Sequence, residues 1–125
     1  MKMENPLEPA GRAALAASRE MLALEPEEKA QALRLMAAGV RNAAEKIIRE
    51  NVLDMEEARK SGRNSAFLDR LLLTPDRVEH MACGIEQVAA LPDPVGECIR
   101  EWTRPNGLRI RQVRVPLGVI GFIYE

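Results

Sequence analysis

The chain has 125 residues, of which 46% are hydrophobic and 30% are charged, and its formal net charge is −1. A chain of this length suits a single domain, and the near-neutral charge argues against a dedicated nucleic-acid-binding protein. No apolar run reaches the roughly 20 residues that a membrane helix needs and no signal peptide is visible, so we expect a cytoplasmic protein without nucleic-acid or membrane partners.

The first two thirds of the chain is predicted to be helical. A first helix extends from Pro9 to about Leu24, and Pro26 then begins a second helix at a position where proline is favoured. We expect Asn51 to end this second helix, and Gly39 within it to mark the close approach of a neighbour. The second helix has the clearest helical period in the chain, carried by Ala30, Leu33, Ala37, Val40, Ala44 and Ile47.

Two shorter helical segments are expected next. Asp54 and Glu57 have the spacing of a capping box, and Gly62 is a suitable stop. A dense apolar patch that must pack inward follows, formed by Phe67, Leu68, Leu71, Leu72 and Leu73. Thr74 and Pro75 then predict the cap and first turn of a helix that ends near Leu91. Its apolar side is predicted to carry Val78, Met81 or Ala82, Ile85, and Val88 or Ala89.

The pattern then changes from helix to strand. Cys98–Thr103 can be extended, and Asn106-Gly107 is a strong signal for a hairpin turn. The return strand, Leu108–Val115, alternates at first between apolar and arginine side chains. Its later residues have the opposite parity, which predicts a bulge near Gln112.

The segment Leu117–Tyr124 is the most apolar in the chain and does not alternate. Such a run is typical of a strand that is buried on both faces of a parallel sheet. Because a strand of this kind needs neighbours that this chain hardly supplies, we interpret the chain as the front section of a larger protein. Gly118 and Gly121 are interpreted as close packing against a covering helix rather than as a phosphate-binding loop.

Cysteine and histidine offer two candidate sites that we consider weak. Cys83 and His80 are three residues apart on one helix, so a reactive pair is geometrically possible, but a packed cysteine is the commoner situation. A zinc site built from both residues and Cys98 would have only three protein ligands, whereas structural zinc normally takes four. The two cysteines indicate no disulfide framework. We therefore predict no metal site.

Several motifs together resemble one enzyme family. They are Leu68-Asp69-Arg70-Leu71, Leu91-Pro92-Asp93-Pro94-Val95-Gly96, Arg104-Pro105-Asn106-Gly107-Leu108 and Arg114-Val115-Pro116-Leu117-Gly118-Val119-Ile120-Gly121, with Asn51 and Asp54 before them. The combination closely resembles γ-glutamyl phosphate reductase, a branch of the aldehyde dehydrogenase superfamily. The resemblance covers nearly the whole chain.

The resemblance implies an α/β parent enzyme, of which this chain is a mainly α-helical part with a C-terminal β-hairpin and one buried strand. Residues 1–97 are expected to be helices that cover the cofactor domain. Residues 98–116 are expected to form the hairpin of an oligomerisation arm, which makes a homo-oligomer the expected assembly. Residues 117–125 are expected to be the first core strand of an NADP-binding Rossmann-like domain.

The resemblance also implies a reaction, namely the NADPH-dependent reduction of L-glutamate 5-phosphate to L-glutamate 5-semialdehyde in proline biosynthesis. Family members use a cysteine that lies beyond the region matched here, so we assign no catalytic residue to this chain and expect it to be inactive alone. Backbone contact with the nicotinamide side of NADPH is expected near Ile123, Tyr124 and Glu125, because ligands bind beyond the carboxyl ends of strands in such sheets.

Two alternatives remain at this point. The chain is a non-enzymatic helical interaction module that pairs through its hairpin, or it belongs to another acyl-phosphate or acyl-thioester reductase of the same superfamily. The Leu91–Gly96 connector argues against the second alternative.

Overall fold

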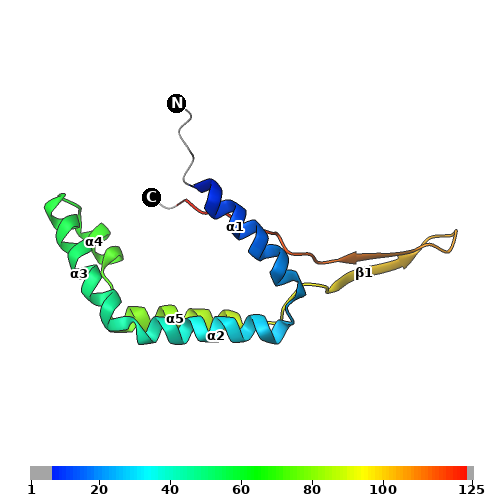
Figure 1. Ribbon diagram of the computed structural model, residues 1–125, viewed down its shortest axis with the longest axis horizontal. Coiled ribbons are helices and arrows are strands. Elements are labelled where there is room, and N and C mark those ends of the chain that lie inside the picture. The colour runs from blue at the N-terminus through cyan, green and yellow to red at the C-terminus, as the bar shows by residue number, and fades with distance from the viewer. Residues whose placement is uncertain (1–6, 124–125) are drawn as a thin grey trace, which may run out of the picture. The chain divides into compact units, whose positions relative to one another are not determined.

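A computed structural model of the protein describes residues 7–123 (Figure 1). These residues fold into two compact units. One is the helical unit Glu27–Leu91, and the other comprises the described residues on either side of it. The prediction of a mainly helical chain with a C-terminal hairpin is confirmed, since the described residues form five α-helices and one antiparallel pair of strands.

The helical unit begins with two consecutive helices, α2 (Pro26–Asn42) and α3 (Ala44–Lys60). The prediction that Asn51 ends a helix is wrong, because α3 continues for nine residues beyond it. The capping box at Asp54 and Glu57 is wrong for the same reason, as both residues lie inside α3. The helices bend at Ala43, although Ala43 N still donates to Gly39 O at 3.0 Å.

Gly62 ends α3 as predicted. Its φ of +70° is left-handed, a conformation that favours glycine, and its N–H donates to Arg59 O at 3.0 Å. The N–H of Arg63 donates to Ala58 O at 3.1 Å, which completes the pair of bonds that defines a Schellman motif. The motif satisfies carbonyl groups that the end of a helix otherwise leaves without partners.

Asn51 is instead a buried polar side chain that joins three helices. Only 5% of the residue is exposed, and its Nδ2 donates to Leu71 O at 2.9 Å while its Oδ1 accepts from Leu73 N at 2.7 Å. Both partners lie at the link between α4 (Ser65–Leu71) and α5 (Pro75–Ala89). One amide side chain on α3 therefore satisfies the backbone groups where α4 ends and α5 is about to begin.

Two side-chain caps set the starts of α4 and α5. Asn64 accepts a hydrogen bond from Phe67 N at 2.9 Å, and Thr74 accepts one from Arg77 N at 3.2 Å, with Pro75 in the first turn. Short polar side chains at these positions satisfy N–H groups that have no partner within the helix. The predicted start of α5 is confirmed, and the helix ends at Ala89, two residues before the expected position.

The core of the helical unit is built mainly from small side chains. The stripe predicted from the period of the second helix faces inward, since Ala37 is fully buried and its other members are half-buried. On α5 the buried residues are Ala82 rather than Met81, and Ala89 rather than Val88. The explanation offered for Gly39 is wrong, because nothing lies within 4 Å of the place where its Cβ would be. The buried apolar residues are Ala37, Met55, Ala58, Val78, Ala82 and Ala89.

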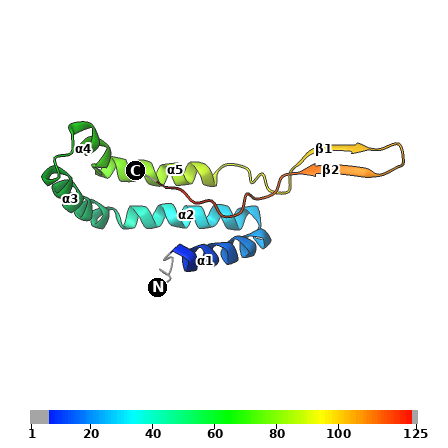
Figure 2. The ribbon, with the colours of Figure 1, turned by 90° about the horizontal axis from the view of Figure 1, so that it is seen from above.

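The helices α2 and α5 run side by side and antiparallel, as Figures 1 and 2 both show. Arg41 joins them by hydrogen bonds to Glu79 and Glu86. Because Arg41 is 38 and 45 residues from these partners, this contact stabilises the tertiary arrangement of the unit rather than a single helix.

The second unit contains α1 (Leu7–Glu20), the 3-10 turn η1 (Met21–Ala23) and the hairpin of β1 (Cys98–Thr103) and β2 (Arg109–Val113). The helix α1 has no buried residue. The residues Ala10, Ala14, Ala17 and Met21, which share one side of this segment by helical spacing, do not form a packed surface, and of these only Ala14 is half-buried.

The hairpin turn forms where Asn106-Gly107 predicted it. Gly107 N donates to Arg104 O and Arg104 N donates to Leu108 O, both at 2.9 Å, and the φ of Gly107 is +83°. Pro105 keeps its own φ negative, so the left-handed residue comes last in the loop. The bulge is confirmed in place, with Cys98 opposite Val113 and Arg100 opposite Gln112, but the extra residue belongs to β1 rather than to the return strand.

Candidate functional site

The segment that follows β2 is exposed and has no strand partner among the described residues. Residues 114–123 form no strand, and the large apolar side chains from Val115 to Ile123 are exposed. The only sheet among residues 7–123 has two strands and offers this segment no partner, so the strand predicted here for the larger enzyme stays a prediction. A strand without a neighbour leaves its backbone hydrogen bonds unmade.

The two glycines of this segment have no covering helix. Nothing lies within 4 Å of a Cβ built on Gly118 or Gly121, so the described residues supply no close contact at either glycine. Gly118 has a φ of +85°, a left-handed conformation that favours glycine. The backbone conformation is therefore enough to account for glycine at this position.

The residues predicted to contact a nicotinamide are not assembled into a site. Ile123 is 96% exposed, and Tyr124 and Glu125 lie outside the described residues. The segment also lacks the glycine-rich turn and the following helix that bind a dinucleotide phosphate. The described residues do not by themselves fit this cofactor, and we derive no chemical step through it.

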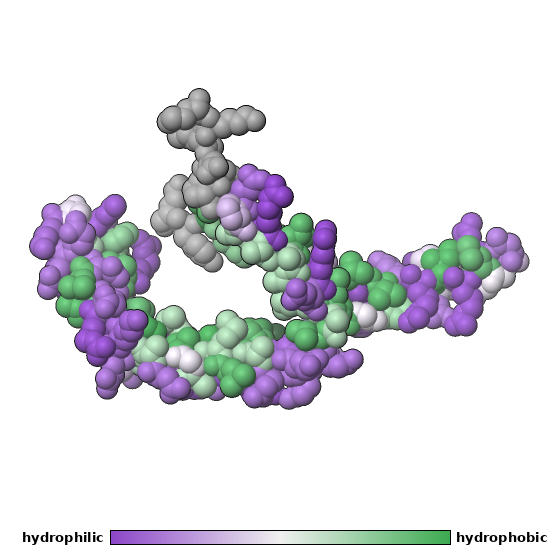
Figure 3. Space-filling view, in the orientation of Figure 1, coloured by the Kyte–Doolittle hydropathy of each residue, from purple (hydrophilic) through white to green (hydrophobic). Residues whose placement is uncertain are grey.

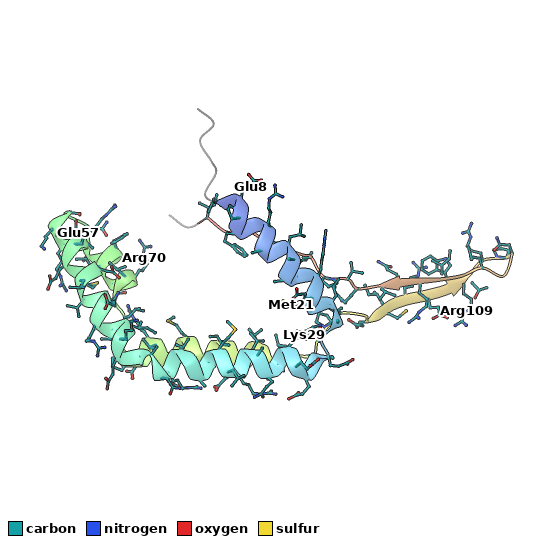
Figure 4. The ribbon with its side chains drawn as sticks, in the orientation of Figure 1. Glu8, Met21, Lys29, Glu57, Arg70 and Arg109 are labelled. Atoms are coloured by element: carbon teal, nitrogen blue, oxygen red, sulfur yellow. The ribbon has the colours of Figure 1, made fainter. Side chains whose placement is uncertain are left out.

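The hairpin presents two chemically different faces. Glu101 and Arg111 are directly opposite each other, and Arg111 Nε lies 3.5 Å from Glu101 Oε2. Arg109, which projects from the hairpin in Figure 4, places its Nε 3.2 Å from Glu101 Oε1. The other face carries the half-buried pair Trp102 and Ile110. The alternation predicted for β2 is thus confirmed.

Among the described residues the sheet consists of β1 and β2 alone. Both outer edges of the hairpin are therefore open to pairing with a further strand. Backbone pairing extends one step beyond the strands, where Arg114 N donates to Glu97 O at 3.0 Å. The side chains of the same residues pair, with Arg114 Nε 2.7 Å from Glu97 Oε2. An open edge presents unpaired backbone N–H and C=O groups to which another strand can add.

A charged cluster on the helical unit surrounds Cys83. Arg41 Nη2 lies 2.7 Å from Glu79 Oε1 and 2.9 Å from Glu86 Oε2, and Cys83 Sγ donates to Glu79 Oε1 at 3.3 Å. The hydrogen bond to Glu79 raises the pKa of the Cys83 thiol, whereas Arg41 lowers the pKa values of both carboxyl groups. A raised pKa disfavours the thiolate, the reactive form of cysteine. The thiol partner is therefore Glu79 rather than His80.

No group of three or more His, Cys, Asp or Glu side chains among residues 7–123 is arranged to hold a metal ion. Cys98, which was the third candidate zinc ligand, is exposed, and its Sγ lies 3.5 Å from Arg100 O. Within the same residues no helix combines the length and the apolar character that crossing a membrane requires.

An open pocket of about 300 Å³ lies between α3 and α4. The acidic residues Asp54 and Glu57 line it together with the apolar residues Phe67 and Leu71. Figure 4 labels Glu57 on α3 and Arg70 on the neighbouring α4. Ser61 and Arg63 complete the polar part of the lining.

The tertiary contacts of Asn51 and Arg41 were not predicted from the sequence. Asn51 continues the inward stripe of α3, four residues before Met55, which is a signal for a buried polar group. Arg41 lies beside the apolar stripe of α2, and nothing local indicates its distant acidic partners.

Comparison with known proteins shows which proteins this chain is similar to. The chain is 53% identical over 115 residues to a γ-glutamyl phosphate reductase of Rhodopseudomonas palustris strain HaA2, a match that covers 92% of the chain. The chain is homologous to part of γ-glutamyl phosphate reductase. It is also 52% identical over 109 residues to the enzyme of the same name from Geobacillus kaustophilus. No family model matches the chain.

Solved structures give the same result. The γ-glutamyl phosphate reductase of Thermotoga maritima matches 90% of the chain with a TM-score of 0.84 and 34% identity. The Saccharomyces cerevisiae enzyme of that name matches 89% with a TM-score of 0.79 and 27% identity. The chain spans only about a quarter of these proteins, 27% of the Rhodopseudomonas relative and 27% of the Thermotoga chain.

Proposed function

We propose that the chain is the N-terminal section of an NADPH-dependent γ-glutamyl phosphate reductase that acts in proline biosynthesis in the cytoplasm. The observation that carries the proposal is the identity of 53% over 92% of the chain, together with a shared fold at a TM-score of 0.84. Two free cysteines are consistent with a reducing compartment.

The proposed reaction is the reduction of L-glutamate 5-phosphate. The products would be L-glutamate 5-semialdehyde and inorganic phosphate, with NADPH as the two-electron reductant that would be oxidised to NADP⁺. If the reaction proceeds through a cysteine thioester, a cysteine thiolate is needed as the nucleophile. Cys83 does not suit that role, since Glu79 raises the pKa of its thiol.

In this proposal the exposed C-terminal segment is completed by the rest of the enzyme. Residues 117–125 become the first core strand of the cofactor domain once neighbouring strands are present, and residues 1–97 cover that domain. The continuous exposure of the apolar side chains from Val115 to Ile123 supports this, because a run of this kind is stable in water only when covered. Contact of NADPH with Ile123, Tyr124 and Glu125 belongs to the same proposal.

The hairpin, residues 98–116, is proposed to join copies of the enzyme into a homo-oligomer. Its open edges and its ordered charged face support this role. A strand added at either edge would continue the backbone ladder, and the arginine and glutamate side chains would fix its register.

The test uses a chimera in which this 125-residue sequence replaces the matched quarter of the Rhodopseudomonas relative. NADPH formation from glutamate semialdehyde is measured with and without inorganic phosphate. We expect phosphate-dependent activity in the chimera and in the unaltered relative, and none in the isolated chain. A folded chimera without activity contradicts the proposed function, and turnover by the isolated chain contradicts the proposal that the catalytic groups lie elsewhere.

A further inference from the structure

The turn of the hairpin brings together the two groups of an intramolecular reaction. Asn106, which is exposed, carries a side-chain amide, and the next residue, Gly107, supplies a backbone nitrogen. Attack of that nitrogen on Asn106 Cγ closes a succinimide ring between the two neighbours. Gly107 has no Cβ to obstruct the approach, and nothing lies within 4 Å of the place where one would be. The attacking nitrogen can therefore reach the amide carbon.

A backbone hydrogen bond prepares the side chain of Asn106 for this attack. Its Oδ1 accepts from Leu108 N at 3.2 Å. When a nitrogen attacks Cγ, negative charge develops on this same oxygen, and a donor that is already in place stabilises that charge. The bond also holds the amide beside the backbone of the turn, which favours an intramolecular step.

Opening of the turn releases the attacking nitrogen. In the closed turn Gly107 N donates to Arg104 O at 2.9 Å, and this bond must break before the nitrogen can attack. Residues 103–109 are all exposed, and Figure 3 shows hydrophilic residues at this end of the hairpin. Exposed backbone hydrogen bonds at a loop open readily. The bond from Leu108 N to Asn106 Oδ1 spans only two residues, so it does not depend on the closed turn.

We propose that Asn106 is a site of spontaneous deamidation. The Gly107 nitrogen forms a bond to Asn106 Cγ and loses its proton, the bond from Cγ to Nδ2 breaks, and Nδ2 leaves as ammonia. Water then opens the succinimide. Cleavage between Cγ and the Gly107 nitrogen gives aspartate, and cleavage between the main-chain carbonyl carbon of Asn106 and the Gly107 nitrogen gives isoaspartate. Water is the only co-reactant, and nothing is oxidised or reduced.

The isoaspartate product is expected to open the hairpin turn. In this product the main chain passes through the former side chain of Asn106 and is one atom longer. The bonds from Gly107 N to Arg104 O and from Arg104 N to Leu108 O both close across that atom, each at 2.9 Å. Both bonds lose their geometry when the loop lengthens. The strand pairing that begins with Thr103 opposite Arg109 then weakens from the turn inward.

Peptide mapping measures the reaction in the 125-residue chain. The chain is incubated for days in warm neutral buffer, cut with trypsin and analysed by mass spectrometry. Asn106 lies in the tryptic peptide 101–109, because trypsin does not cut between Arg104 and Pro105, and Asn64 lies in the tryptic peptide 64–70.

Asn64 is the matched internal control. It is exposed and its Oδ1 also accepts a backbone N–H, that of Phe67, but its next residue is Ser65 in the first turn of α4. Ser65 has a Cβ, and its nitrogen is fixed at the start of a helix. We expect Asn106 to be converted about tenfold or more faster than Asn64, with isoaspartate among the products.

The single tryptophan, Trp102, reports the consequence for the hairpin. It lies opposite Ile110 and is half-buried. As isoaspartate accumulates, the emission of Trp102 is expected to shift to longer wavelength, because the ring becomes more exposed to water. Asn106→Gln, whose longer side chain does not readily form the ring, is expected to keep its mass and its emission through the same incubation.

The outcomes decide each step of the proposal. Equal conversion of Asn106 and Asn64 overturns it. Aspartate without isoaspartate also overturns it, because that result indicates direct hydrolysis of the side chain rather than attack by Gly107. Unchanged Trp102 emission in a sample converted to isoaspartate overturns the opening of the turn. Faster conversion at Asn106, with an emission shift that Asn106→Gln does not show, supports the proposal. None of these measurements depends on reductase activity, so they leave the proposed function untouched.

Discussion

Replacing Asn51 with alanine is expected to loosen the junction of three helices. The substitution removes the donor to Leu71 O and the acceptor from Leu73 N, two contacts of 2.9 and 2.7 Å. A buried backbone group that loses its partner costs about 1–3 kcal/mol. Since Leu71 and Leu73 are half-buried, water replaces part of each bond. We therefore expect a loss of about 2–3 kcal/mol in the free energy of unfolding.

Urea unfolding followed by circular dichroism at the helix band measures this loss. For a slope of about 1–3 kcal/mol per molar, a loss of this size lowers the urea midpoint by about 0.7–3 M. Glu50→Ala is the matched control, because Glu50 is the preceding residue of the same helix and is exposed. Hydrogen exchange at the Leu73 amide is expected to accelerate in Asn51→Ala alone. Equal midpoints for the two variants, with no change at Leu73, would refute the reasoning.

Three further predictions concern charge and backbone. Arg41 lowers the pKa values of Glu79 and Glu86, so its stabilising contribution is present above their unfolded pKa of about 4.3 and disappears as the pH falls through the lower folded values. Arg41→Ala should thus lower the urea midpoint more at pH 7 than in acid, and an effect that stays constant as the pH falls until both carboxyl groups are protonated would contradict this. Gly62→Ala should destabilise the chain by about 1 kcal/mol, because the φ of +70° is unfavourable for alanine. Gly39→Ala should instead stabilise the isolated chain by about 0.5–1 kcal/mol, since it adds a helix-favouring residue in open space. Thermal unfolding of both glycine variants checks these signs, and a shift in the same direction for both would show that backbone conformation does not decide them.

Local physical chemistry accounts for the features that the sequence predicted well. A threonine followed by proline favours the cap and first turn of a helix, and α5 begins there. A glycine just past a helical run closes α3 through a left-handed residue. The hairpin turn at Asn106-Gly107 is equally local, because only a few neighbouring residues determine it. In each case the decisive hydrogen bonds span five residues or fewer.

Features that depend on distant residues were the ones the sequence did not reveal. Asn51 resembles a helix stop because asparagine is a poor helix former, yet its partners 20 and 22 residues away hold it inside α3. The apolar run after Arg114 has the composition of a buried strand, but among the described residues no strand pairs with it.

By itself, the sequence determined where the caps, turns and inward stripes of the helices lie, since these follow from residue conformation and periodicity. Tertiary structure alone decided that Asn51 bridges to the α4–α5 link, that Arg41 joins two helices, and that residues 114–123 stay extended and exposed. The physical reason is that a hydrogen bond, an ion pair or a strand pairing has two partners. When those partners are far apart in the chain, only the fold determines whether they meet.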